Sequence, residues 1–183
     1  MFGNQSPQTY LKTSFNSESK SITTSTQQFD SKKVNVYGHI SSLLLKFSVT
    51  ITKGTGTINT AKTPLSAVGQ IVIRDKNSRP IIDEDASRLT IVRKILSLAD
   101  TPSWQTFKKG EYDAGTALTD VATAQTFEME IPIDINLEDQ PISIEWTANA
   151  LSSVLSTVGT ASATCQLECA VTSIVPVGES ANL

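Results

Sequence analysis

The fold is decided by residues 43–52, LLLKFSVTIT, in which large apolar and polar side chains alternate along most of the stretch. Successive side chains of a β-strand point to opposite faces, so every second residue of this stretch shares a face. The apolar face carries Leu43, Leu45, Phe47, Val49 and Ile51. The segment is therefore predicted to be a long strand with one buried face.

Five further segments alternate in the same way or form short apolar runs between turn residues. They span residues 70–74, 79–82, 126–135, 142–147 and 161–175. The first two flank the sequence DKNS at 75–78, whose residue types favour a turn, so they are predicted to form a hairpin. Pro132 lacks the N–H that a central strand donates, which places its strand at a sheet edge or at a bulge.

One helix is predicted over residues 86–99, because apolar residues recur there at steps of three and four. Asp83 or Asp85 caps its start, and Pro102 ends it. Residues 110–125 follow as a long polar loop. Seven or eight strands with one short helix predict an all-β protein, built as an antiparallel two-sheet sandwich.

The sequence divides into a sandwich and two tails. Residues 1–33 are rich in Ser, Thr, Gln, Asn and Lys and show no helical period, so they are predicted to form a polar N-terminal arm. This arm is either a disordered tail or an extended segment that crosses onto a neighbouring subunit. Residues 34–176 form the sandwich, and residues 177–183 form a C-terminal tail. If the arm crosses, removing residues 1–28 should leave a folded protein that assembles poorly.

Charge and hydropathy exclude several classes of partner. The chain has 39% hydrophobic residues, 18% charged residues and a net charge of −3, and its basic residues are scattered. Without a basic stripe, direct sequence-specific binding of nucleic acid is not expected. The sequence has no run of about 18 apolar residues, and its N-terminus lacks the pattern of a signal peptide, so neither a membrane-spanning helix nor an export signal is expected.

Residue types that carry chemistry are few. Cys165 and Cys169 lie four apart in a predicted strand, which separates their Cα atoms by about 13 Å, too far for a disulfide. Free, buried thiols fit a protein kept in a reducing cytoplasm. With His39 as the single histidine, a zinc site built from the usual His and Cys ligands is not expected.

Two acidic clusters have alternative interpretations. Glu128 and Glu130 share a strand face, as a glycosidase pair would, but solvated charges on an edge strand explain them more simply. The sequence DED at 83–85 would suit calcium by its oxygens, yet the spacing of a calcium loop is absent and helix capping explains the same residues. No catalytic residue, cofactor or metal site is therefore predicted, and the chain is predicted not to be an enzyme.

Aromatic residues are the candidate contact residues. Two of them lie in the polar arm and three follow the predicted helix, where they either form a contact patch or seal the end of the sandwich. Aromatic side chains anchor interfaces when they are exposed together. The predicted interface residues are Phe15, Phe29, Trp104, Phe107 and Tyr112.

The order of the predicted elements resembles that of the single jelly-roll capsid proteins of icosahedral viruses, including membrane-containing phages of the adenovirus-like lineage. The resemblance covers residues 34–175, and its most suggestive local piece is residues 64–74, PLSAVGQIVIR. It implies a non-catalytic shell subunit with a single jelly roll, in which two Greek keys form the two sheets. The commoner double jelly roll of that lineage needs about twice the length.

The resemblance also implies partners and a location. The partners are copies of the same chain and other capsid proteins, with the surface of an internal viral membrane as a further candidate. The protein is expected in the virion, after assembly in the host cytoplasm. A major capsid subunit, a penton (vertex) subunit and a spike base are all open, and the alternative function is a carbohydrate- or receptor-binding β-sandwich such as an adhesin.

Overall fold

The computed structural model of the chain describes residues 8–16, 19–36, 38–89, 118–137 and 141–176. Within these residues eight strands have six residues or more, three are shorter, and two 3-10 turns occur. The long strands are β1 (Gln8–Asn16), β3 (Gln27–Val34), β4 (His39–Thr52), β6 (Val68–Arg74), β7 (Pro80–Asp85), β8 (Gln125–Leu137), β9 (Ile142–Ala148) and β11 (Ser162–Pro176). The short elements are β2 (Lys20–Ile22), β5 (Thr57–Ile58), η1 (Pro64–Ala67), η3 (Leu151–Ser153) and β10 (Leu155–Thr157).

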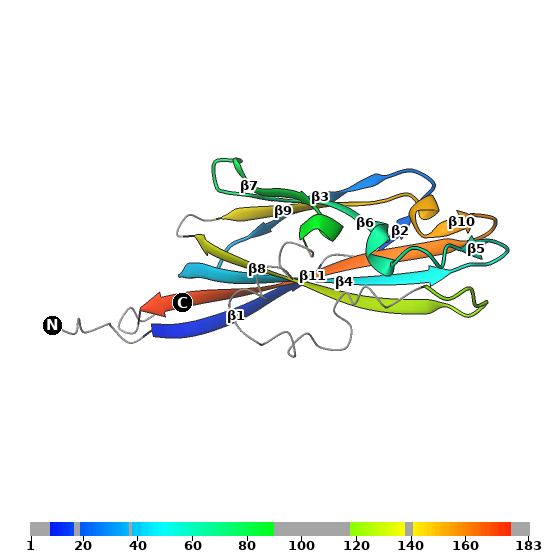
Figure 1. Cartoon of the computed structure of the whole chain (residues 1–183). Coiled ribbons are helices and arrows are strands. Elements are labelled where there is room, and N and C mark those ends of the chain that lie inside the picture. The colour runs from blue at the N-terminus through cyan, green and yellow to red at the C-terminus, as the bar shows by residue number, and fades with distance from the viewer. Residues whose placement is uncertain (1–7, 17–18, 37, 90–117, 138–140, 177–183) are drawn as a thin grey trace.

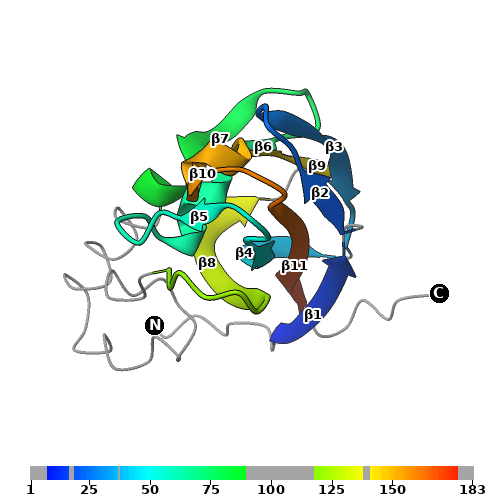
Figure 2. The same ribbon diagram turned by 90° about the vertical axis from the view of Figure 1, so that its right-hand side faces the viewer.

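The long strands form two antiparallel sheets with the orders β1-β11-β4-β8 and β3-β9-β6-β7, and β2 also pairs with β11. Figures 1 and 2 show the two sheets as two layers. In chain order, the first long strand pairs with the eighth, the second with the seventh, the third with the sixth and the fourth with the fifth. This nested pairing is that of one long hairpin rolled into two layers, which is a jelly roll. The predicted all-β sandwich with a single jelly roll is confirmed.

The predicted alternation of residues 43–52 is confirmed in β4, which runs through the middle of the first sheet. Every residue of the predicted apolar row is at most 1% exposed. β11 pairs with β4 in register, so that Leu45 lies opposite Cys169, and both side chains are buried. The inward side chains of β4 and β11 form the first sheet's half of the core, against which the second sheet packs.

The predicted hairpin is formed by β6 and β7 and is closed by the turn at residues 75–78. The Asp75 carboxylate accepts hydrogen bonds from the Asn77 and Arg79 N–H groups, each at 2.8 Å. Ser78 completes the turn with a φ of 63°, in the left-handed region. The turn therefore closes through an aspartate side chain, as the residue types of the DKNS sequence indicate.

β8 lies at the edge of the first sheet, because β4 is its one strand neighbour among the described residues. In that pairing Pro132 stands opposite Leu44. A missing N–H is tolerated in an edge strand, and the predicted edge position is confirmed.

The N-terminal residues differ from the predicted polar arm. β1 and β2 run along β11, and β3 runs along β9, so the described part of residues 1–33 lies within the two sheets. Among the described side chains of this segment, Ile22 and Phe29 are the buried apolar ones. Two such residues are too few to reveal a strand by periodicity. Removing residues 1–28 would strip β1 and β2 from β11, so we expect the fold itself to be destabilised.

The predicted helix is described over residues 86–89, and residues 90–99 lie outside the described residues. Asp85 caps it, because its carboxylate accepts hydrogen bonds from the Ser87 N–H at 2.9 Å and from the Ser87 hydroxyl. One of the two predicted caps is thus found. In the described part of the chain, no helix has the length and apolar character that crossing a membrane requires.

Candidate assembly surfaces

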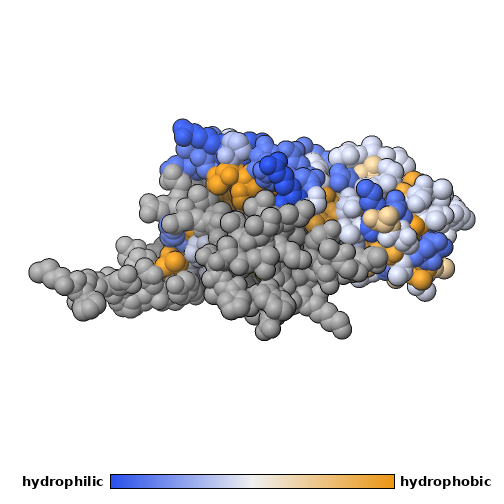
Figure 3. Space-filling view, viewed as in Figure 1, coloured by the Kyte–Doolittle hydropathy of each residue, from blue (hydrophilic) through white to orange (hydrophobic). Residues whose placement is uncertain are grey.

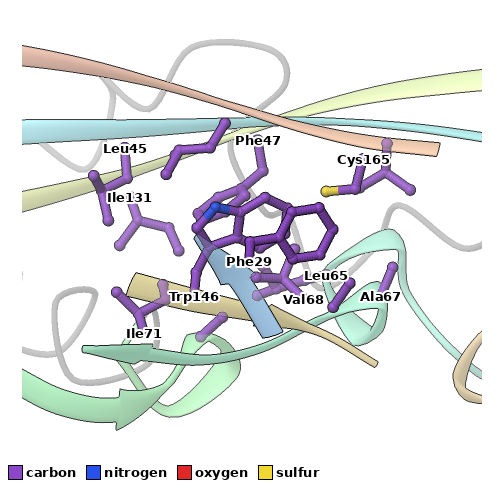
Figure 4. Close-up of a cluster of buried hydrophobic side chains, with 14 of the residues drawn as sticks. Phe29, Leu45, Phe47, Leu65, Ala67, Val68, Ile71, Ile131, Trp146 and Cys165 are labelled. Atoms are coloured by element: carbon purple, nitrogen blue, oxygen red, sulfur yellow. The ribbon is translucent and has the colours of Figure 1, made fainter. Parts of the chain in front are cut away.

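Phe29, one of the predicted contact residues, lies in the core of its own chain (Figure 4). β3 places it opposite Trp146 of β9, and the two rings stack with their centroids 3.8 Å apart and an interplanar angle of 10°. Phe47 of the other sheet meets Trp146 edge-on at 5.3 Å. Trp146 thus links the two layers, and Phe29, which is 4% exposed and stacked on it, is not free to anchor a neighbouring subunit.

The other predicted contact residues divide into one at a sheet edge and three outside the described residues. Phe15 of β1 is half-buried against the core, and its Cα pairs with that of Cys169. Trp104, Phe107 and Tyr112 lie outside the described residues. Of the five, Phe15 is the residue that the structure places at a partly exposed sheet edge.

The end of the sandwich that carries β5 and β10 is closed by two loops that hydrogen-bond to each other. The Thr55 N–H donates to the Thr160 hydroxyl and the Thr160 N–H donates to the Thr55 hydroxyl, both at 3.0 Å. We call this pair of bonds the threonine clasp. Gly54 precedes one threonine and Gly159 the other, both at positive φ. A Cβ on Gly54 would lie 2.7 Å from the Thr160 carbonyl oxygen, and one on Gly159 would lie 2.6 Å from the Thr55 hydroxyl oxygen.

An ion pair braces the same end. The Asp120 carboxylate accepts hydrogen bonds from the Ile58 N–H at 3.1 Å and from the Lys53 ammonium at 3.0 Å. Both donors favour the charged carboxylate, so the Ile58 N–H and then Lys53 hold the pKa of Asp120 below its ordinary value of 3.8. Asp120 thereby ties the loop before β8 to β5 and to the residue that follows β4.

Acidification is expected to weaken this brace. Folding lowers the pKa of Asp120, so its contribution to stability is present above a pH of about 4 and is lost as the pH falls through the folded-state pKa. The Asp120→Asn variant has no such proton to bind. We expect its free energy of unfolding, measured with urea, to fall less than that of the wild type between roughly pH 6 and pH 3. Lys53→Met keeps the titrating carboxyl and should lie between the two, whereas three equal pH slopes would show that the brace does not form.

Charged side chains on both outer faces are paired within the chain. On the first sheet the Lys46 ammonium lies 3.2 Å from the Glu128 carboxylate, and on the second sheet the Arg74 guanidinium lies 3.4 Å from Glu145. Figure 3 shows the surface over β7 as mostly hydrophilic, and the end with β5 and β10 as mostly of intermediate hydropathy. Glu128 is therefore one half of a surface ion pair on an edge strand. This agrees with its interpretation from the sequence as a solvated charge on such a strand.

The acidic residues of β7 each have a separate partner. Asp83 accepts a hydrogen bond from Gln70, Glu84 pairs with Arg88 at 3.4 Å, and Asp85 caps the helix. Successive side chains of a strand point to opposite faces, so the three carboxylates do not converge. Within the described residues, no group of three or more His, Cys, Asp or Glu side chains is placed to hold a metal ion.

Cys165 and Cys169 lie on the inward face of β11 as free, buried thiols, which confirms the prediction for both. Burial raises the pKa of each thiol to about 12. The thiolate is the nucleophilic form, so both groups are inert near neutral pH. They act as small apolar packing groups of the core.

The native protein is expected to resist thiol reagents. At roughly pH 8, Ellman's reagent should leave Cys165 and Cys169 unmodified until a denaturant unfolds the chain, when both react. Ser156→Cys places a thiol at an exposed position of β10 and is the positive control. The raised pKa also means that the unfolded chain loses these protons first, so the free energy of unfolding should fall as the pH rises above about 9. Rapid labelling of the native wild type would show that β11 does not face the core.

The threonine clasp and the Asp120 brace were not among the predicted sites. In the sequence, Gly54-Thr55-Gly56 indicates a turn and nothing more. Its partner Thr160 lies 105 residues further on, and both threonines stand among many others. Further Gly-Thr pairs occur at 56–57, 115–116 and 159–160, so the sequence does not single out the pair at 159–160 as the partner.

The comparisons with known proteins concern the fold. No family model and no curated protein sequence matches the chain. Among solved structures, the chain is similar to the STIV MCP, with a TM-score of 0.62 and 12% identity over 90% of this chain and 48% of that one. It is similar to a chain in the atomic structure of Sulfolobus Turreted Icosahedral Virus, with a TM-score of 0.59 and 12% identity over 90% and 45%.

A third similarity is to a chain of the PBCV-1 virus capsid, with a TM-score of 0.54 and 12% identity over 96% of this chain and 44% of that one. This chain therefore spans slightly under half of the length of each of these solved chains. Identities of 12% establish the fold alone. In fold, the chain resembles the jelly-roll capsid proteins of viruses, as its order of strands predicts.

Proposed function

We propose that this chain is a structural subunit of a viral capsid, which assembles with copies of itself and with other capsid proteins into a closed shell. The observation that carries the proposal is the jelly roll of β1-β11-β4-β8 on β3-β9-β6-β7, whose structure is similar, over at least 90% of this chain, to chains of two viruses. A fold alone does not assign a function, so the properties of the surface have to agree with this role.

The surface agrees with assembly through many modest contacts. Among the described residues, the large apolar side chains that are exposed are Ile81 and Val121, which lie in different elements. The surface ion pairs Lys46–Glu128 and Arg74–Glu145 neutralise charge on both outer faces. Contacts made by such a surface are individually weak, and closed symmetry multiplies them into a stable particle.

The described strands of this chain form one jelly roll. The chain covers 44–48% of the three solved chains. We propose that the subunit acts in the virion after assembly in the host cytoplasm, without a catalytic role. Within the shell, the subunit takes the position of a major capsid, penton or spike-base protein. Contact with the surface of an internal viral membrane is part of the same proposal.

The proposal is tested by the size of the assembled protein. Size-exclusion chromatography with light scattering, followed by negative-stain microscopy, should show closed particles or rings of subunits. A monomer over the full range of concentration and salt would contradict the proposal. The same monomer with a signal on a glycan array would instead support a carbohydrate-binding sandwich.

A further inference from the structure

The four long edge strands of the two sheets, β1, β3, β7 and β8, are not equivalent. An edge strand presents unpaired N–H and C=O groups, and soluble proteins protect such edges with bulges, prolines or charged residues. β3, β7 and β8 each have a register shift in the pairing with their one neighbour. β7 also begins at Pro80, β8 contains Pro132, and β3 carries the exposed Lys32 and Lys33 beside its bulge. Three of the four edges are therefore unsuited to pairing with another strand.

β1 is the least protected of these edges within the described residues. Its nine residues pair with β11 without a shift, from Gln8 opposite Pro176 to Asn16 opposite Glu168. The strand contains no proline and one charged residue, Lys12. Thr13 and Ser14, the described side chains nearest to Lys12, are exposed. Among the described residues β11 is the one strand neighbour of β1, and Figure 2 shows β1 as the last strand of its layer.

We propose that β1 pairs, antiparallel, with β1 of a second copy of this chain about a two-fold axis, so that the two first sheets join into one continuous sheet. Two-fold pairing satisfies both open edges at once and then stops, whereas head-to-tail pairing would leave edges open. A low net charge of −3 opposes the approach of two copies little. The inference deepens the proposed function, on which it rests for the presence of many copies.

The sequence of β1 restricts the register of this pairing. An antiparallel two-fold pair has one residue opposite its own copy, and like charges opposite each other are destabilising. This argues against an axis at Lys12, although Lys12 is the middle of the strand. An axis at Thr13 places Lys12 opposite Ser14, and an axis at Leu11 places Lys12 opposite Tyr10. We therefore expect the axis at Leu11 or at Thr13, with seven residue pairs in either case.

Single cysteines test the proposal in the full-length protein. The native thiols are buried, so the wild type is the blank. Each residue from Thr9 to Phe15 is replaced in turn by cysteine and oxidised with copper phenanthroline. A disulfide requires Cα atoms closer than about 7 Å, so the axis residue should give at least about tenfold more dimer than its neighbours in the strand. Ser31→Cys, exposed on the bulged β3 edge, is the matched control.

A single maximum at Leu11→Cys or Thr13→Cys, with little dimer from Ser31→Cys, supports the proposal. A flat profile, or equal dimer from Ser31→Cys, would overturn it. The result is distinguishable from a failure of the proposed function. Cross-linked dimers without closed particles would support the β1 pairing and contradict the capsid function. Closed particles without cross-links would support the capsid function and contradict the β1 pairing.

Proline variants add a test in which folding is monitored. N–H groups of successive strand residues point to opposite sides, so one of Thr13 and Ser14 donates toward β11 and the other toward the open edge. Of Thr13→Pro and Ser14→Pro, one should unfold at lower urea concentration. The other should keep the wild-type midpoint and lose the dimer, and a dimer retained by that variant would overturn the proposal.

Discussion

Replacing Trp146 with alanine is expected to lower the free energy of unfolding by about 3–5 kcal/mol, as truncation of a buried Trp does. Trp146 is 2% exposed and touches rings of both layers, with Phe29 stacked on one side and Phe47 meeting it edge-on. Its loss therefore opens a cavity where the sheets meet (Figure 4). Urea denaturation followed by circular dichroism measures the change.

Phe29→Ala tests which chain supplies the ring. We expect a loss of about 3–5 kcal/mol and a coupling of about 0.5–1.5 kcal/mol with Trp146→Ala in a double-mutant cycle. Because Phe29 packs in its own chain, the loss should not depend on protein concentration. A loss that appears only above the concentration at which the chain associates would mean that Phe29 comes from a neighbouring subunit. Ile81→Ala, at a side chain 37% exposed, is the control and should change little.

Valine in place of either glycine beside the threonine clasp is the second large effect. Gly54 and Gly159 have φ values of 53° and 51°, where a β-branched residue is strained, and each added Cβ would meet the opposite loop. We expect Gly54→Val and Gly159→Val each to lower the free energy of unfolding by about 2–4 kcal/mol. Differential scanning fluorimetry and urea denaturation give the ranking.

Controls separate the clasp from general sensitivity of this end of the sandwich. Ser156→Val adds the same side chain at an exposed position of β10 and should be nearly neutral. The two glycine variants share one clasp, so the double variant should lose less than the sum of the two. Neutral single variants, or a fully additive pair, would show that the loops at 54–55 and 159–160 do not pack together.

The strands that bury a row of apolar side chains could be predicted from the sequence, because burial of one face gives an alternating pattern. β4 and β11 pack against the core along almost their whole length, and both apolar rows appear in the chain as predicted. β1 and β3 could not be recognised in this way. Their described side chains include few buried apolar residues, so Phe29 stands among polar ones and resembles a residue of a free arm.

Contacts between loops that are distant in the sequence could not be predicted, because no pattern in the sequence indicates them. The clasp is built from glycine and threonine, which are common turn residues, and its specificity lies in the approach of two backbones. Asp120 lies in a segment that was predicted to be a loop, and its ion pair with Lys53 depends on the roll of the sheets that brings β5 beside it. Side-chain type predicts burial better than it predicts which loops meet.

Electron cryomicroscopy of particles assembled from the purified chain tests the central claim most directly. The account predicts closed shells tiled by two-layer sandwiches, in which each subunit shows the strand order β1-β11-β4-β8 over β3-β9-β6-β7. Shells whose subunits have another strand order would contradict the fold, and a chain that stays monomeric and forms no shell would contradict the function.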